Sequence, residues 1–218
     1  MYISRPNQMK YIIIGQQCTG KSQVMEMLKG WGLRCGRIFT NIPKPEDEAE
    51  SQHGIYIPRD YEYYPTKDIL EVFENKAYIF LQELTCEGAG PDLGFRYMEG
   101  LSQWEWENND VFAMSPDQLL GINAQSLGRS EVCFIWLDGT KGARAARHRL
   151  ERRSYSFSER EEIEQPFTSD LCRYIYGFNE SGPKVIYFSD EEPERAAVIA
   201  YTVIKHPELL TLYTTHFS

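Results

Sequence analysis

Apolar runs alternate with amphipathic stretches along most of the chain, and this alternation predicts the order of its strands and helices. Short apolar runs are typical of buried strands, and such runs lie within residues 10–14, 110–115, 131–139 and 184–190. Apolar residues at helical spacing predict helices over residues 22–31, 65–76, 116–128 and 191–205. Strands that alternate with helices predict an α/β fold with a mostly parallel sheet.

The segment between residues 35 and 98 breaks this alternation and predicts an inserted β-rich subdomain. Residues 34–40 and 77–84 have the composition of strands, and residues 55–64 are β-like and rich in tyrosine. An acidic loop that contains prolines separates the first of these segments from the tyrosine-rich one. The sequence therefore predicts a second group of strands beside the parallel sheet.

Composition and charge narrow the function classes. The chain has 218 residues and a formal net charge of −9. Its apolar runs are far shorter than the roughly 20 residues that a membrane helix needs, and its first residues lack the apolar core of a secretory signal. Five cysteines without a C-x-x-C pair indicate neither a zinc site nor a disulfide framework. These features predict a cytoplasmic protein with no membrane partner.

The net negative charge argues against a broad nucleic-acid-binding surface, because such surfaces use many Lys and Arg contacts to phosphate. One segment has the opposite charge. Residues 141–153 (KGARAARHRLERR) carry six Lys or Arg against one Glu. A solvated helix face is the usual role of such a run, and phosphate binding is the alternative.

The stretch "GQQCTGKS", residues 15–22, is the strongest functional signal. It fits G-x-x-x-x-G-K-[ST], a loop whose backbone N–H groups surround phosphates between a strand and a helix. In this motif Lys21 reaches the β- and γ-phosphates, and the Ser22 hydroxyl ligates Mg²⁺. The other phosphate-binding residues that the motif predicts are Gly15, Gln17, Cys18, Thr19 and Gly20.

The order of these pieces resembles guanylate kinase, a family of P-loop nucleoside monophosphate kinases. The phosphate loop comes first, a β-rich insert follows, an Arg-rich helix lies near residue 145, and a strand–helix pair closes the chain. The resemblance covers residues 9–205 and is strongest at the loop. It implies one P-loop kinase domain over residues 1–218, with a core at 9–34 and 110–205, an acceptor-binding insert at 35–98 and a lid at 141–168.

The basic segment acquires a role from this resemblance. "HRLERRS", residues 148–154, is similar to the R-L-x-x-R-G lid helix of the family, with Arg149 and Arg153 on the matching arginines. An arginine fork bonds two phosphate oxygens at once, and a closing lid excludes water. The resemblance thus implies Lys21, Arg149 and Arg153 as catalytic residues, with no protein nucleophile.

The acceptor site is implied by a longer and weaker match. Residues 60–83 look like the family's D-Y-x-F strand, its following helix and the strand with base-contacting acids. Tyr61 then takes the place of a tyrosine that binds the acceptor phosphate, and the guanine-reading glutamate falls at Phe80 or, with a shift, at Glu83. The remaining acceptor candidates are Lys44 in "TNIPKP" and Asp117 in "MSPDQ". The implied ligands are ATP, Mg²⁺ and a nucleotide acceptor such as (d)GMP.

Two alternatives stay open at this point. Ile42 stands where the family has an arginine in its T-T-R-P-P-R-P stretch, which leaves room for another acceptor, such as a hydroxymethylated base in DNA. Nucleic acid then enters only as a substrate. The second alternative is a non-catalytic guanylate-kinase-like binding module, against which the intact loop motif argues. The sequence indicates no oligomeric state.

Overall fold

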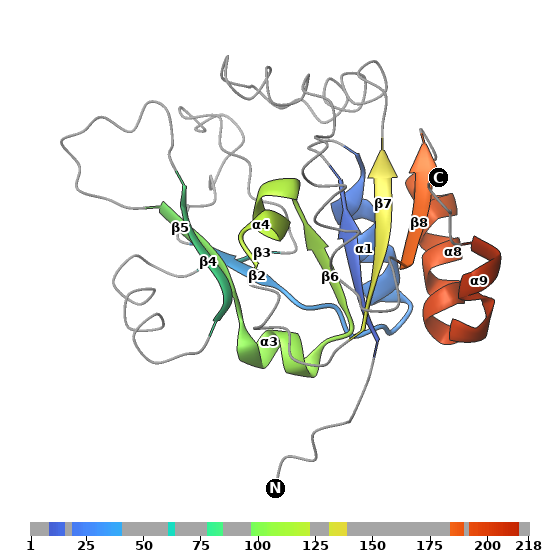
Figure 1. Cartoon of the computed structure of the whole chain (residues 1–218), viewed down its shortest axis with the longest axis horizontal. Coiled ribbons are helices and arrows are strands. Elements are labelled where there is room, and N and C mark those ends of the chain that lie inside the picture. Colours follow the sequence, from blue (N-terminus) through green and yellow to red (C-terminus); the bar gives the residue numbers. More distant parts are fainter. Residues whose placement is uncertain are drawn as a thin grey trace, which may run out of the picture.

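The largest unit of the protein is a four-stranded parallel sheet with the strand order β6-β1-β7-β8 (Figure 1). The computed structural model describes residues 9–15, 19–40, 61–63, 78–84, 97–122, 131–138, 184–189 and 192–213. The strands of this sheet are β1 (Lys10–Ile14), β6 (Val111–Met114), β7 (Val132–Asp138) and β8 (Lys184–Ser189). The strand that precedes the glycine-rich loop is therefore a central one.

Strand β1 is buried on both faces of the sheet. Tyr11 and Ile13 belong to one apolar cluster, whereas Ile12 and Ile14 belong to another. Successive side chains of a strand point to opposite faces, so the two clusters lie on the two sides of the sheet. This double burial explains why residues 11–14 of β1 are all apolar rather than alternately apolar and polar.

Two helices cover the first face. Helix α1 (Lys21–Gly30) follows the loop, and α8 (Pro193–Lys205) follows β8. Helix α8 packs through small side chains, with Ala196, Ala197 and Ala200 all buried, which lets it lie close to the sheet. The 3₁₀ helix η3 (Pro207–Leu209) and helix α9 (Leu210–Tyr213) complete this side.

A second, smaller sheet lies beyond β6 (Figure 1). Its strands are β2 (Ile38–Thr40), β3 (Tyr61–Tyr63), β4 (Tyr78–Leu84) and β5 (Tyr97–Ser102), in the order β3-β2-β5-β4. Strands β2 and β3 are parallel, and the other two pairings are antiparallel. The described strands therefore form one parallel sheet and one mixed sheet.

The smaller sheet shares a core with the second face of the parallel sheet. Phe80 and Leu101 belong to the same buried cluster as Phe112 of β6. Helices α3 (Gln103–Asn108) and α4 (Pro116–Leu120) contribute to it as well. Trp106 of α3 stacks on Phe112 with ring centroids 5.0 Å apart. The two sheets are thus joined by apolar packing as well as by the chain.

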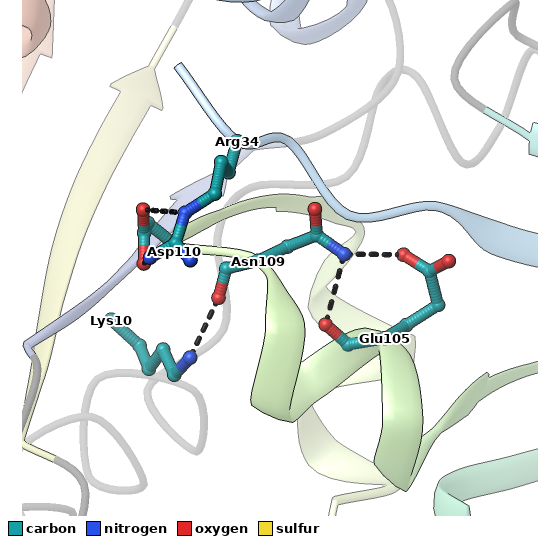
Figure 2. Close-up of polar contacts among 5 residues, drawn as sticks. All are labelled: Lys10, Arg34, Glu105, Asn109 and Asp110. Carbon is teal, nitrogen blue, oxygen red and sulfur yellow. Dashed lines mark hydrogen bonds and ion pairs between the residues drawn. The ribbon is translucent and has the colours of Figure 1, made fainter. Parts of the chain in front are cut away.

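The amino end of the parallel sheet is closed by a polar cluster, shown in Figure 2. Lys10 Nζ donates to the Asn109 carbonyl at 2.6 Å, and Arg34 bonds both carboxylate oxygens of Asp110, at 2.9 and 2.7 Å. The Asn109 amide donates to Glu105 Oε2 at 2.7 Å. Burial lowers the pKa of Lys10, an effect that nearby Asp110 opposes. The cluster fixes where β1 and β6 begin.

The segment before β2 extends the parallel sheet by one rung outside β6. Cys35 forms an isolated parallel bridge with Val111, and the Gly36 amide donates to the Val111 carbonyl at 2.8 Å. The segment then continues into β2 of the smaller sheet. This segment leads the chain from the parallel sheet into the smaller sheet.

The predicted parallel α/β sheet is confirmed, and its four strands and two covering helices lie within a few residues of their predicted positions. The strand predicted at residues 34–40 is reduced to Ile38–Thr40 and the bridge at Cys35. Strand β5 and helix α3 were not predicted. The helix predicted at residues 65–76 and the lid lie outside the described residues, and the division into core, insert and lid stays a prediction. None of the helices in the described part of the chain is long and apolar enough to span a membrane.

Candidate functional site

The glycine-rich loop connects the carboxyl end of β1 to the first residue of α1, as its motif requires. Gly20 caps the helix with φ at 94°, a left-handed conformation that favours glycine. A Cβ at Gly15 would lie 2.5 Å from both the Leu137 carbonyl oxygen and Thr19 Oγ1. Both fixed glycines of the motif therefore have a structural reason, one in backbone conformation and the other in close approach.

Lys21 holds its ammonium group at this loop. Its Nζ donates to the Gly15 carbonyl at 2.7 Å, so the side chain folds back from the first turn of α1 toward the end of β1. Ser22, the next residue, is half-buried, and the side chain of Thr19 in the same loop is buried. The structure thus brings together Gly15, Thr19, Gly20, Lys21 and Ser22, the described members of the predicted phosphate-binding set.

The electrostatics of this end of α1 favour an anion. The first backbone N–H groups of a helix have no partner within the helix, and the helix dipole places partial positive charge there. The first turn of α1 contains no acidic residue that would neutralise this charge, and its N-cap residue, Gly20, makes no side-chain capping bond. Together with the Lys21 ammonium, these donors suit a phosphate group.

Two neighbouring strands place polar groups at the same edge of the sheet. Because Ile14 pairs with Met114 and with Trp136, the residues that follow these three lie beside one another. Ser115 follows β6, and Asp138 ends β7. Tyr187 of β8 donates to Asp138 Oδ2 at 2.6 Å and so fixes its carboxylate. Ligands of open α/β sheets bind beyond the carboxyl ends of the strands, which is where these groups lie.

Helix α4 begins at this edge with a capping box. Ser115 Oγ accepts from the Gln118 backbone amide at 3.3 Å, and Gln118 Oε1 accepts from the Ser115 amide at 2.8 Å. This reciprocal pair is the S-x-x-Q signature of a helix start, with Pro116 at the first helical position. The other end of the Gln118 side chain, Nε2, donates to Glu99 Oε2 of β5 at 2.9 Å.

The predicted acceptor residues are spread over the smaller sheet and α4. Tyr61 lies in β3 and Glu83 in β4, at opposite edges of the sheet, so three strand spacings of about 4.8 Å separate the two backbones. Asp117 lies in the first turn of α4, one residue before Gln118. Phe80, the other position considered for the guanine-reading glutamate, is buried in the shared core.

The other predicted site residues lie outside the described part of the chain. They are Gln17 and Cys18 of the loop, Lys44 of the insert, and Arg149 and Arg153 of the lid. Their roles stay predictions.

Residues that sequence reasoning missed are Glu99 and Gln118, and the pairing of Tyr187 with Asp138. Gln118 carries a readable signal, because S-x-x-Q after an apolar strand predicts a capped helix. Glu99 carries none, since an isolated acid in a short strand of mixed composition reads as a surface residue. In the structure both residues are buried, with Glu99 only 5% exposed and Gln118 only 2% exposed.

Comparisons with known proteins show structural likeness at low identity. A search with the sequence matches no protein-family model and no curated protein. Among solved structures, the chain is similar to guanylate kinase from Anaplasma phagocytophilum, with a TM-score of 0.49 and 14% identity over 96% of this chain and 90% of that one. It is also similar to an unliganded sugar kinase from a Janibacter species, with a TM-score of 0.39 and 14% identity over 97% and 100% of the two chains. At such identity, function has to be inferred from the residues of the site.

Proposed function

We propose that the protein is an ATP-dependent phosphotransferase that moves the γ-phosphoryl group of ATP to a nucleoside monophosphate, (d)GMP or a related nucleotide. The observation that carries this proposal is the loop between β1 and α1. Gly20 has the required left-handed backbone, and Lys21 Nζ lies 2.7 Å from the Gly15 carbonyl. Motif and geometry thus agree at the carboxyl edge of a parallel sheet.

Each described loop residue has a defined task in this proposal. Lys21 exchanges its bond to the Gly15 carbonyl for bonds to phosphate oxygens, and the first amides of α1 donate to the same group. Ser22 offers a hydroxyl oxygen, the type of ligand that Mg²⁺ prefers. When bound, Mg²⁺ supplies positive charge at the β- and γ-phosphate oxygens. The first turn of α1 has no acidic residue that would repel the phosphates.

The acceptor and lid roles complete the proposal. Arg149 and Arg153 clamp the transferring group, where charge spreads over three oxygens and positioned cations supply most of the catalysis. Tyr61 and Lys44 hold the acceptor phosphate, and Glu83 and Asp117 contact the acceptor. The separation of β3 and β4 across the smaller sheet suits an extended acceptor, with its phosphate and its base at different strands.

A coupled ATP-turnover assay with a panel of acceptors tests the proposal. The panel contains the nucleoside and deoxynucleoside monophosphates and a duplex that carries a hydroxymethylated base. We expect turnover that depends on Mg²⁺ and is fastest with a guanine monophosphate. Turnover with the duplex alone would show that the acceptor is DNA and not a nucleoside monophosphate. Nucleotide binding without turnover of any acceptor would overturn the proposal in favour of a binding module.

The acceptor assignment has its own test in Tyr61→Phe, which keeps the ring and deletes only the hydroxyl. Losing one hydrogen bond to a charged phosphate should weaken acceptor affinity by about 10- to 100-fold, while ATP affinity stays the same. Unchanged acceptor kinetics would remove Tyr61 from the site.

A further inference from the structure

A chain of hydrogen bonds crosses from the smaller sheet to the phosphate-binding edge of the parallel sheet. It runs from Glu99 Oε2 to Gln118 Nε2 at 2.9 Å, and from Gln118 Oε1 to the Ser115 backbone amide at 2.8 Å. Ser115 follows Met114, which pairs with Ile14 directly before the loop. Glu99 is thus connected to the edge at which the phosphate loop starts through one side chain.

The orientation of the Gln118 amide is fixed by its partners. A backbone N–H only donates, so the atom that faces the Ser115 amide is the oxygen, and the NH₂ group faces Glu99. The Glu99 carboxyl group accepts that bond whether it is ionised or neutral. The donors and acceptors in this series of hydrogen bonds therefore follow from the partners of Gln118 and not from an arbitrary assignment of its amide oxygen and nitrogen.

Because Glu99 and Gln118 are buried, these hydrogen bonds are an expensive way to stabilise the fold if stability is their only role. Glu99 lies in β5, between β2 and β4, and it shares the inner face of the sheet with Leu101 of the apolar core. Taking a carboxyl group and an amide out of water has a large desolvation cost. Apolar side chains of similar volume often stabilise such a position equally well or better.

We infer that Glu99, Gln118 and Ser115 form a positioning link that sets the place of the smaller sheet relative to the phosphate loop. The inference rests on the proposed function, in which the smaller sheet holds the acceptor. Apolar surfaces can slide over one another, whereas two hydrogen bonds through one side chain fix both distance and direction. Phosphoryl transfer needs that accuracy, because a misplacement of about 1 Å can cost roughly 10²-fold in rate.

The link predicts that stability and activity can be separated. Glu99→Leu or Gln118→Leu alone breaks the bond between these two side chains and leaves the other polar end buried with one bond fewer, so each single variant should lose both thermal stability and turnover. The double variant Glu99→Leu/Gln118→Leu removes both polar ends and should be more stable than the less stable single variant, with a remaining loss of melting temperature from the missing bond to the Ser115 amide. Its kcat should stay roughly 10- to 100-fold below that of the wild type, with the KM for ATP unchanged.

Helix α3 offers a matched control. Gln103 Nε2 donates to Glu107 Oε1 at 2.9 Å, the same bond type and length, on an exposed surface. Gln103→Ala/Glu107→Ala should leave kcat unaltered. Recovery of both melting temperature and kcat in the Glu99/Gln118 double variant would overturn the link and show a purely structural pair.

A second readout separates failure of the link from failure of the proposed function. Hydrogen exchange is followed in residues 97–102 with and without Mg·ADP. In the wild type, nucleotide should slow exchange in β5 as well as in the loop, and in the double variant it should slow exchange in the loop alone. If no acceptor is turned over, the proposed function fails, and this pattern still supports the link. The link would be overturned if Mg·ADP slowed exchange in β5 equally in the wild type and the double variant, or did not slow it in the wild type.

Discussion

The two ends of the parallel sheet use polar residues in opposite ways. At the amino end, Lys10, Arg34 and Asp110 are each bonded to fixed partners of the fold (Figure 2). At the carboxyl end, Lys21 is bonded to the carbonyl of Gly15, within the loop that it serves. A bound phosphate can replace such a partner without disturbing the sheet.

The difference indicates that the amino end of the sheet supports the structure, whereas the carboxyl end carries the groups that bind ligand. The amino-end cluster joins segments far apart in sequence and sets the start of β1 and β6, so it acts as a frame. The carboxyl end carries the loop, the start of α1 and the capped start of α4 on strands that this frame holds in place. Functional groups on loops that a rigid scaffold positions are the common arrangement in proteins.

The largest expected effect comes from removing the carboxyl-end cation. Lys21→Ala should lower kcat by on the order of 10²-fold or more, because it deletes a contact to the charge that develops during transfer. The fold should persist, since Lys21 is outside both apolar clusters. Steady-state kinetics and a melting curve measure the two properties separately.

Lys29→Ala is the matched control, because Lys29 is an exposed lysine in the last turn of the same helix. It should retain wild-type turnover. If Lys21→Ala kept near-normal turnover, the carboxyl end would not be the phosphate site.

Alkaline pH should reveal how tightly the apolar core of the parallel sheet excludes water. Burial raises the pKa of Cys133, which pairs with Tyr11 in the sheet, from 9.0 to about 12. The unfolded chain then releases the thiol proton first, so the free energy of unfolding falls as pH rises above 9, by about 1.4 kcal/mol per pH unit from this group. Cys133→Val should flatten the fall by close to that amount between about pH 10 and 11 in chemical denaturation, where the unfolded thiol is mostly ionised and the folded one mostly protonated. Identical slopes would mean that Cys133 titrates normally in the fold.

The smallest effect is expected at the amino end. Asp110→Ala removes the fork with Arg34 and should lower the free energy of unfolding by about 1 kcal/mol, since Arg34 is partly exposed to solvent. The KM for ATP and kcat should not change, because the cluster lies at the opposite end of the sheet. A fall in kcat comparable with that of Lys21→Ala would end the distinction between the two ends.

The sequence predicts the parallel sheet and the loop because both depend on local patterns. β1 has a continuous apolar run, and the fixed glycines and lysine of the loop lie within eight residues of each other. Strand β5 was missed because "YMEGLS" contains a glutamate and a glycine, which interrupt the alternation of a strand. Its pairing with β2 and β4 decides its conformation instead.

The partners of the polar groups depend on contacts that no local pattern contains. Lys10 and its acceptor are 99 residues apart, Arg34 and Asp110 are 76 apart, and Glu99 and Gln118 are 19 apart. Composition marks all of these as ordinary surface residues. Only the fold shows that Lys10, Glu99 and Gln118 are buried.

Amide chemical-shift changes on titration with Mg·ADP test the division of roles most directly. The account predicts that the largest changes fall on Gly15, on residues 19–24 and on Ser115, with small changes at Arg34 and residues 105–110. Lys21→Ala should reduce the changes at the loop, because it removes one of the groups that contact the phosphates. Changes centred on the amino end, or a wild-type protein that shows none at saturating nucleotide, would contradict the claim that the carboxyl edge of the sheet is the nucleotide site.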